Sequence, residues 1–246
     1  MTESQHAVTH FYLAPDAISG NDCHFDSDES HHIANVMRAK IGTQIKATDG
    51  SGKLYTVEVA GLSHNMVHAR IVEAATNVNE LPGELSIAFG LLPGAKIEQI
   101  IDQCTQLGAT AIQPIFCEKI AVTWKKEREA NKLERWRRIA VSAMKQSCRC
   151  RLPELLPPVS LDTLCESFKN YDLVLLGSVD GKTISALDLG APPQRILTIT
   201  GPEEGFAASE EQQMLAAGAI AVSLGARRLR AELAPVALVS QLLSLL

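Results

Sequence analysis

The sequence predicts an α/β protein, with a C-terminal domain built on a mainly parallel sheet and a small β-barrel before it. In residues 83–246, short apolar runs of strand length alternate with helical patterns, and most of the runs end near a glycine or a proline. Runs of this kind are typical of parallel strands that helices cover on both faces. In residues 1–75, short and closely spaced segments of strand character predict the barrel.

One short helix is expected among the strands of the N-terminal domain. It should span about residues 28–38 and turn Ile33, Val36 and Met37 inward. The glycine-rich segment Asp49-Gly50-Ser51-Gly52 between two strand patterns predicts a β-hairpin. The expected strands are residues 10–14, 44–49, 53–60 and 66–74.

The C-terminal domain begins after a polar linker at residues 75–83. Pro93-Gly94 opens a helix with an apolar stripe, which Gly108 ends. A long basic helix is expected at about residues 127–148, with Trp136, Ala140 and Met144 on its apolar side. The expected strands are residues 85–92, 111–116, 171–177, 195–200 and 219–224.

Composition indicates an ordinary soluble protein that can bury a core. Of the 246 residues, 46% are hydrophobic and 21% are charged. No apolar run approaches the roughly 20 residues that span a bilayer, and no secretory leader is recognisable, so we expect a cytoplasmic protein without a membrane segment. The six cysteines include no CxxC pair and the seven histidines show no HxxxH spacing. The sequence therefore predicts no metal site.

Charge is concentrated in one segment of the chain. Residues 119–151 contain eleven Lys or Arg and three Glu, a net charge of +8, whereas the whole chain carries −5, which leaves −13 for the remainder. A basic face on an acidic body is the pattern expected of a protein that binds a phosphate backbone. The alternative is a solvated helix with pairs such as Glu134 with Arg138, but three acidic residues cannot neutralise eleven basic ones.

Two segments near the C-terminus carry the strongest functional signal. Residues 196–206 and 219–234 each read as a strand, a glycine-containing turn and a helix, with Arg230 and Glu232 expected just inside the second helix. Ligands of parallel sheets bind beyond the carboxyl ends of the strands, where these turns lie. The glycines and charges predict a neutral ligand held by main chain, beside an anionic partner held by arginine; these residues are Gly201, Gly205, Gly225, Arg227, Arg228, Arg230, Glu203 and Glu232.

A second glycine-containing segment, residues 177–183 (GSVDGKT), nearly matches a nucleotide-binding phosphate loop. The motif needs four residues between its glycines, and here there are three. Nucleotide binding therefore stays a minor alternative, and the lack of a GxGxxG sequence gives no support to a dinucleotide site.

Five motifs, in order along nearly the whole chain, resemble the RsmE family, the 16S ribosomal RNA uridine-N3 methyltransferases of the SPOUT (trefoil-knot) superfamily. The first three matches involve His32 to Arg38 (HxxxVLR), Lys96 with Gln106-Leu107-Gly108 (K…ELG), and Trp136 to Ile139 with Gln146-Ser147, Arg149 and Pro153. The other two are Gly201 to Phe206 (GPEGGF) and Leu224 to Ala234 (LGxRxLRxExA).

This resemblance implies a PUA-like RNA-binding barrel, a SPOUT knotted methyltransferase domain, S-adenosylmethionine as cofactor, and a homodimer that acts on 16S rRNA of the small ribosomal subunit. For cofactor binding we expect Leu176, Gly177, Ile199, Gly201, Pro202, Gly205, Ser223, Leu224, Gly225 and Leu229. For RNA binding we expect Arg38, Lys125, Lys126, Arg137, Arg149 and Arg151.

Methylation of uridine N3 requires removal of the imide proton, which a carboxylate can accept while a cation stabilises the charge on the base. Glu232 is the expected base or orienting group, Arg230 the cation, and Glu203 the alternative carboxylate. The chain departs from the family motif at Glu204, where glycine is usual, and at Ala231 and Leu233, where threonine is usual. A left-handed backbone at Glu204 would cost about 1 kcal/mol. An RNA-binding family member with weak or no transfer activity therefore stays the alternative.

Overall fold

The computed structural model describes residues 10–63, 66–120, 122–188 and 190–245. Residues 1–9 and 64–65 of the predicted barrel domain lie outside the described part. The chain forms two compact units, Met1–Glu80 with Val141–Leu152, and Leu81–Ala140 with Pro153–Leu246. Helix α3 (Glu129–Gln146) therefore contributes to both units. None of the described helices is long and apolar enough to cross a membrane. The predicted boundary between residues 75 and 83 stays a prediction.

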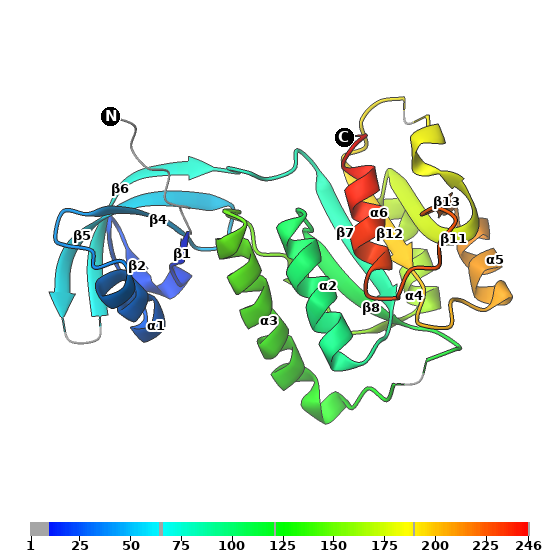
Figure 1. Cartoon of the computed structure of the whole chain (residues 1–246), viewed down its shortest axis with the longest axis horizontal. Helices are drawn as coiled ribbons and strands as arrows, with labels where there is room; N and C mark the ends of the chain where they lie inside the picture. The colour runs from blue at the N-terminus through cyan, green and yellow to red at the C-terminus, as the bar shows by residue number, and fades with distance from the viewer. Residues whose placement is uncertain (1–9, 64–65, 121, 189, 246) are drawn as a thin grey trace. The chain divides into compact units, whose positions relative to one another are not determined.

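The first unit contains a six-stranded sheet in the order β1-β4-β5-β6-β3-β2 (Figure 1). The pair β1–β4 is parallel, and the other neighbours are antiparallel. The predicted hairpin between β4 and β5 is confirmed, and Gly50 and Gly52 take the positive φ values of its turn, 79° and 98°. The strands are β1 (Phe11–Tyr12), β2 (Ile18–Ser19), β3 (Asp22–His24), β4 (Gln44–Thr48), β5 (Lys53–Ser63) and β6 (Met66–Thr76).

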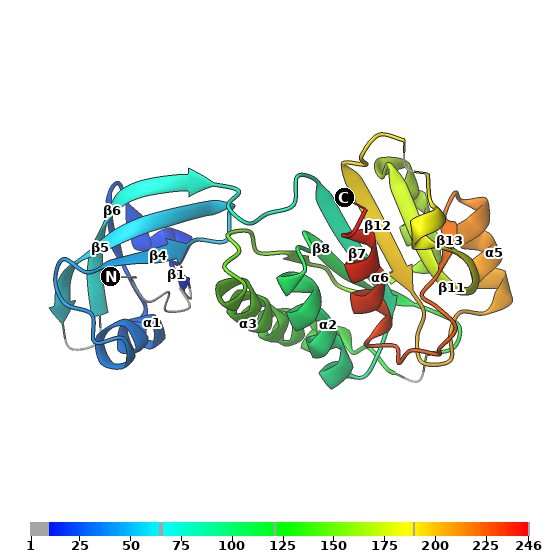
Figure 2. The same cartoon turned by 45° about the horizontal axis from the view of Figure 1, so that its top comes forward.

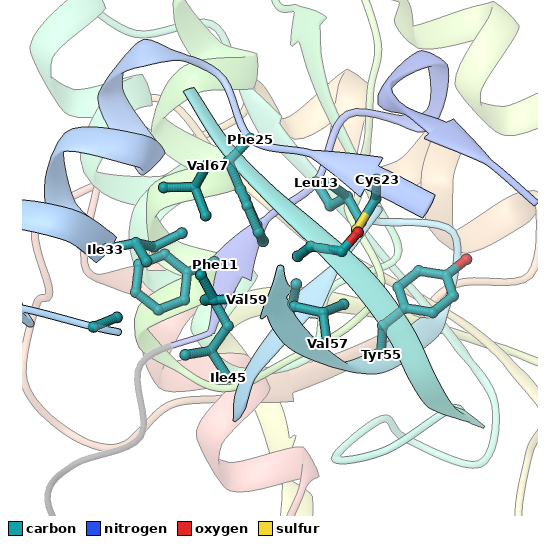
Figure 3. Close-up of a cluster of buried hydrophobic side chains, with 13 residues drawn as sticks. Phe11, Leu13, Cys23, Phe25, Ile33, Ile45, Tyr55, Val57, Val59 and Val67 are labelled. Atoms are coloured by element: carbon teal, nitrogen blue, oxygen red, sulfur yellow. The ribbon is translucent and has the colours of Figure 1, made fainter. Parts of the chain in front are cut away.

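Alternation along the strands places one face of this sheet on an apolar core. Val57 and Val59 of β5 are buried while Glu58 between them is exposed. Figure 3 shows the two valines beside Phe11 and Phe25, whose rings meet edge to face at 6.2 Å. The first unit thus has its own core, as an independent domain requires.

The short helix of the first unit differs from the prediction at its C-terminal end. Helix α1 (Ser27–His31) begins at Asp26, whose carboxylate accepts the Glu29 N–H, and continues as a single π-helical turn η2 (His32–Val36). Ile33 is buried as expected. Val36 and Met37 are exposed at 63% and 47%, so their expected inward orientation is wrong. The wider π turn changes the facing of the residues that follow it.

The segment after α3 is fastened to the first unit by a buried ion pair. Arg149 donates to Glu80 through Nε (3.1 Å) and Nη2 (2.6 Å), and the two side chains are 2% and 4% exposed. The other oxygen of Glu80 accepts the N–H groups of Cys150 and Arg151, both at 2.8 Å. One carboxylate therefore satisfies four donors, which compensates the cost of burying the charge.

The second unit is built on a parallel sheet in the order β10-β8-β7-β12-β11-β13, with β9 also beside β8. Every recorded pair in it is parallel, which confirms the predicted α/β class. Its strands are β7 (Glu84–Gly90), β8 (Ala111–Phe116), β9 (Glu154–Leu155), β10 (Val159–Ser160), β11 (Leu173–Thr183), β12 (Arg195–Thr200) and β13 (Ile220–Ser223).

Helices cover both faces of this sheet. Helices α2 and α6 pack against each other on one face, and α4 and α5 on the other (Figures 1 and 2). The apolar stripe expected in α3 is confirmed, since Trp136, Ala140 and Met144 are all buried. The remaining helices are α2 (Gly94–Gln106), α4 (Leu161–Glu166), α5 (Ala208–Ala216) and α6 (Ala234–Leu242), with 3₁₀ turns at η1 (Pro15–Ala17), η3 (Lys126–Arg128), η4 (Phe168–Asn170) and η5 (Ile184–Ala186).

The near-match to a phosphate loop is part of a strand. Strand β11 pairs with Val222 of β13 through Gly177, bulges, and returns to the same residue through Lys182. A Cβ atom at Gly181 would lie 2.4 Å from the Val222 nitrogen, so this glycine permits a close backbone crossing. A phosphate loop instead leads from a strand into a helix, so the nucleotide-binding alternative is wrong for this segment.

Candidate active site

The first predicted turn follows β12 and is shaped by two glycines and a proline. Gly205 has a φ of 75° and its N–H donates to Pro202 O at 2.9 Å. Gly90, at the end of β7, lies directly beneath Pro202, because a Cβ atom at position 90 would come within 2.5 Å of its ring and nitrogen. Glu204 is not among the described non-glycine residues with positive φ. Glutamate therefore replaces the usual glycine at this position without left-handed strain.

The second predicted turn is longer than expected. After β13 the chain runs without regular structure from Leu224 to Leu233, and helix α6 starts at Ala234. The expectation that Arg230 and Glu232 lie inside the helix is wrong. Pro235 sits in the first turn of α6, where its missing N–H costs nothing, and so marks the helix start later in the sequence.

The two turns line one cavity of ≈ 590 Å³ beyond the carboxyl ends of β12 and β13, beside residues 177–179 in the middle of β11. This volume is within the roughly 300–1,000 Å³ of small-molecule sites. Seven of the expected cofactor residues line it: Gly177, Gly201, Pro202, Gly205, Leu224, Gly225 and Leu229. The other three do not. Leu176 and Ile199 are fully buried, and Ser223 is half-buried with its hydroxyl accepting the Gly225 N–H at 3.3 Å.

The lining fits a nucleoside ligand that is held by main chain. At Gly177 and Gly201 no side chain separates the backbone from the cavity, and at Gly205 and Gly225 the space around the missing Cβ is open within 4 Å. Thr200, next to Gly201, has a buried hydroxyl without a hydrogen-bond partner among the described residues. Thr200 itself is not among the lining residues, so the contacts that the lining offers a ligand come from the bare main chain of the glycines.

Charged side chains meet at the edge of this cavity. The Lys96 ammonium contacts Glu203 Oε1 at 2.5 Å and Glu232 Oε2 at 3.3 Å. Arg228 Nη2 donates to the Glu203 carbonyl at 3.2 Å, and Arg230 Nη1 lies 4.0 Å from Glu232 Oε1. Three segments that are distant in sequence, namely α2, the first turn and the second turn, are therefore joined by one cation.

This arrangement favours the charged forms of Glu232 and Lys96 near neutral pH. The pKa of Glu232 is lowered by its own backbone N–H and by the Lys96 ammonium, against the opposing effect of burial. The pKa of Lys96 is raised, first by Glu203 and then by Glu232, against desolvation. Glu232 is thus a carboxylate of low basicity, and Lys96 stays a cation.

Sequence reasoning did not assign a role to Lys96. The residue was visible as part of the matched helix motif and in the first turn of a helix that follows a buried strand. Its partners come from positions 203 and 232, so only the fold brings the three side chains together. Glu203 lines the cavity, whereas Arg230 and Glu232 are not among its lining residues.

The expected RNA-binding residues fall on both units. In the second unit Lys125, Lys126 and Arg137 are exposed, and in the first unit Arg38 is exposed with a φ of 56°. Arg151 is half-buried. The expectation that Arg149 binds RNA is wrong, because its guanidinium is buried against Glu80 and holds the fold of the first unit. No disulfide links the six cysteines, and in the described part of the chain no three metal-ligating side chains gather.

Comparison with known protein families identifies two domains in the chain. Residues 79–243 match an RNA methyltransferase domain, and residues 25–72 match an RNA methyltransferase PUA domain. The ribosomal RNA small subunit methyltransferase E of Synechocystis is 32% identical over 95% of this chain and 77% of its own length. The enzyme of the same name from Bacillus subtilis is 31% identical over 85% of this chain and 84% of its own.

Solved structures show the same fold over nearly the whole chain. A ribosomal RNA small subunit methyltransferase E from Neisseria gonorrhoeae bound to S-adenosyl methionine has a TM-score of 0.84 and 30% identity, and covers 97% of this chain and 98% of its own. A putative methyltransferase from Legionella pneumophila, also with bound S-adenosyl methionine, has the same TM-score and coverage at 27% identity. The family that the motifs predicted is confirmed: the chain belongs to the ribosomal RNA small subunit methyltransferase E (RsmE) family of RNA methyltransferases.

Proposed function

We propose that this protein transfers a methyl group from S-adenosylmethionine to N3 of one specific uridine in 16S ribosomal RNA of the small subunit. The observation that best supports this proposal is the ≈ 590 Å³ cavity lined by two glycine-containing turns, with Glu203 on its wall. We further propose that the enzyme works in the cytoplasm, where the ribosomal subunit is found, and as a homodimer.

The residues proposed to hold the cofactor are the seven expected ones that line the cavity. When bound, S-adenosylmethionine supplies an electrophilic methyl carbon on a sulfonium, whose thioether leaves with the carbon–sulfur electron pair. Backbone at Gly201 and Gly225 can approach a purine nucleoside closely, since neither position carries a side chain. Leu224, Leu229 and Pro202 supply apolar contacts.

The acceptor needs a base and a cation. We propose that Glu203 takes the N3 proton, because its carboxylate is exposed and faces the cavity. The nitrogen lone pair that this releases forms the new N–C bond. Glu232 has a lowered pKa and a side chain that is only 14% exposed, and we propose that it positions Lys96. The Lys96 ammonium then stabilises negative charge that spreads onto the uracil oxygens.

RNA contacts are proposed for the exposed basic residues of both units. Lys125, Lys126 and Arg137 lie on the basic segment of the second unit, and Arg38 and Arg151 belong to the first. Arg230, 86% exposed and 4.0 Å from Glu232, can hold a phosphate near the acceptor. Contacts to phosphate give affinity, while an unpaired base is presented to the site.

The test is mass spectrometry of nucleosides and oligonucleotides from 16S rRNA of cells with and without the gene. We expect one uridine to lose a single methyl group in the strain without the gene, and to regain it when the gene is restored. An identical methylation pattern in both strains would overturn the proposal. Glu204 does not favour the alternative of an inactive RNA-binding relative, since its backbone carries no left-handed strain.

A further inference from the structure

A strained arginine ends the short helix of the first unit. Arg38 has a φ of 56°, in the left-handed region that favours glycine. The residue after it, Ala39, donates its N–H to Ile33 O at 3.0 Å and so closes the end of the helix, where glycine is the usual residue. Among the described non-glycine residues with positive φ, Arg38 is the only charged one. A strained residue where glycine would relax the chain indicates a function for its side chain.

Apolar side chains flank this arginine and face solvent. Val36 is 63% exposed, Met37 47% and Ile41 69%. Exposed apolar residues that are scattered singly are ordinary, whereas a group of them within six positions is typical of an interaction surface. We call residues 36–41, with the exposed Val36, Met37, Arg38, Lys40 and Ile41, the cap segment.

The backbone of the cap segment is fixed at several points. Ala39 is buried in the core of the first unit. The Thr43 N–H donates to Lys40 O, and the Thr43 hydroxyl accepts the Lys40 N–H, both at 2.9 Å. The Gly42 N–H donates to Val59 O of β5 at 2.8 Å. A backbone held in this way has little conformational entropy left to lose when its side chains bind a partner.

The charge of this part of the chain is positive. Residues 30–48 contain Arg38, Lys40 and Lys46 but neither aspartate nor glutamate, although the whole chain carries −5. Basic side chains hold phosphates, and aliphatic side chains pack against unstacked bases or wedge between them. The segment lies within residues 25–72, which match the PUA domain of RNA methyltransferases. A partner that offers both phosphates and exposed base faces, which is RNA with unpaired bases, therefore fits both kinds of side chain.

We propose that the cap segment is a preformed RNA contact, in which Val36, Met37 and Ile41 pack against an unstacked base of the substrate RNA. Arg38 and Lys40 hold the phosphates beside that base. The proposal rests on the proposed function and adds a contact to a base to the contacts with phosphate. The arginine persists at a glycine position because its guanidinium binds RNA, so the strain serves recognition and not folding.

Arg38→Gly separates binding from folding. The variant should keep or raise the Tm, since glycine adopts the left-handed backbone without strain. It should bind small subunits from cells that lack the gene about fivefold more weakly, and the slope of log Kd against log salt should fall by about 1. Lys40→Gln should give the same losses at a wild-type Tm. If both variants bind subunits with wild-type affinity and salt dependence, the proposal is overturned.

Serine substitutions test the contact to the base. Val36→Ser and Ile41→Ser should each weaken binding to the same subunits about threefold without a change in the salt slope, while the Kd for S-adenosylmethionine stays within twofold of wild type. Val72→Ser is the matched control, because Val72 is a 49% exposed valine on β6 of the same unit and lies outside the cap segment. Serine variants that bind subunits as tightly as the control would overturn the contact to the base.

Photocross-linking identifies the partner directly. With a photoreactive benzoylphenylalanine in place of Ile41, we expect cross-links to 16S rRNA, and far fewer with the same group in place of Val72. Cross-links from position 41 only to ribosomal protein, with a wild-type protein that methylates the subunits, would overturn the RNA contact and leave the proposed function intact. A wild-type protein that neither binds nor methylates the subunits would refute the proposed function and this proposal with it.

Discussion

Gly90→Ala is expected to displace the first turn and so weaken cofactor binding. The added Cβ would lie 2.5 Å from the nitrogen and Cδ of Pro202, and ordinary contact begins at 3.4 Å, so the turn must move by about 0.9 Å. Overpacking of this kind costs roughly 1–3 kcal/mol. For a chain of this size that lowers the Tm by about 2–12 °C. A binding site tolerates only about 0.5 Å of displacement, so we expect the Kd for S-adenosylmethionine to rise about tenfold, equal to about 1.4 kcal/mol.

Isothermal titration calorimetry with S-adenosylmethionine and thermal unfolding provide the measurements. Gly94→Ala is the control four residues along the chain, because a Cβ there meets nothing within 4 Å and the residue begins α2. The control should keep the wild-type Kd and Tm. Wild-type affinity in Gly90→Ala would refute the reasoning that the contact between Gly90 and Pro202 sets the position of the turn.

Three further predictions concern charge. Lys96→Met should slow transfer at least tenfold, because Glu203 and Glu232 lose their shared cation, and Lys96→Arg should restore part of the rate. Single-turnover rates measure this, and an unchanged rate in Lys96→Met would contradict it. Between pH 5 and 8 the transfer rate should show no inflection from Glu232, because the pKa of Glu232 is lowered and its carboxylate is ionised throughout. A pH–rate profile with a Glu232-dependent inflection would contradict this. Glu80→Gln should cost about 3–5 kcal/mol of unfolding free energy by leaving the Arg149 charge buried and unpaired, and denaturant melts that match wild type would argue otherwise.

Local patterns in the sequence were sufficient to predict most of the regular elements. The apolar run at residues 111–116 forms β8 with the same bounds, and the stripe of α3 is buried as its periodicity predicts. The hairpin at Asp49–Gly52 follows from its glycines alone. The knotted path of the chain, by contrast, stays a prediction from the family resemblance.

Two of the misses have a common physical cause, which is contact between residues far apart in the chain. The glycine at 181 looked like part of a phosphate loop, but it serves a crossing over Val222. Arg149 looked like an RNA contact in a basic segment, but Glu80, 69 residues away, buries its charge. Sequence periodicity reports only on neighbours within a helix or strand, so it could not identify these partners.

The sequence was sufficient to predict where the site lies, but not the role of each charged side chain in it. Two glycine-containing turns, after the strands β12 and β13 that flank β11 in the sheet, were sufficient to place the cavity. The role of each carboxylate depended on Lys96, which reaches position 203 from a helix more than a hundred residues earlier. Exposure then distinguishes the roles of the two carboxylates. Glu203 is exposed on the wall of the ≈ 590 Å³ cavity, whereas Glu232 is not among the residues that line it.

Reconstitution with purified components tests the proposed reaction most directly. Small subunits from cells that lack the gene would be incubated with the purified protein and S-adenosylmethionine that carries a labelled methyl group, and the labelled nucleoside identified by mass spectrometry. We predict one labelled methyl per subunit, on N3 of a single uridine, and none with Glu203→Gln. No incorporation by the wild-type protein, or a label on a different base or on ribose, would contradict the mechanism.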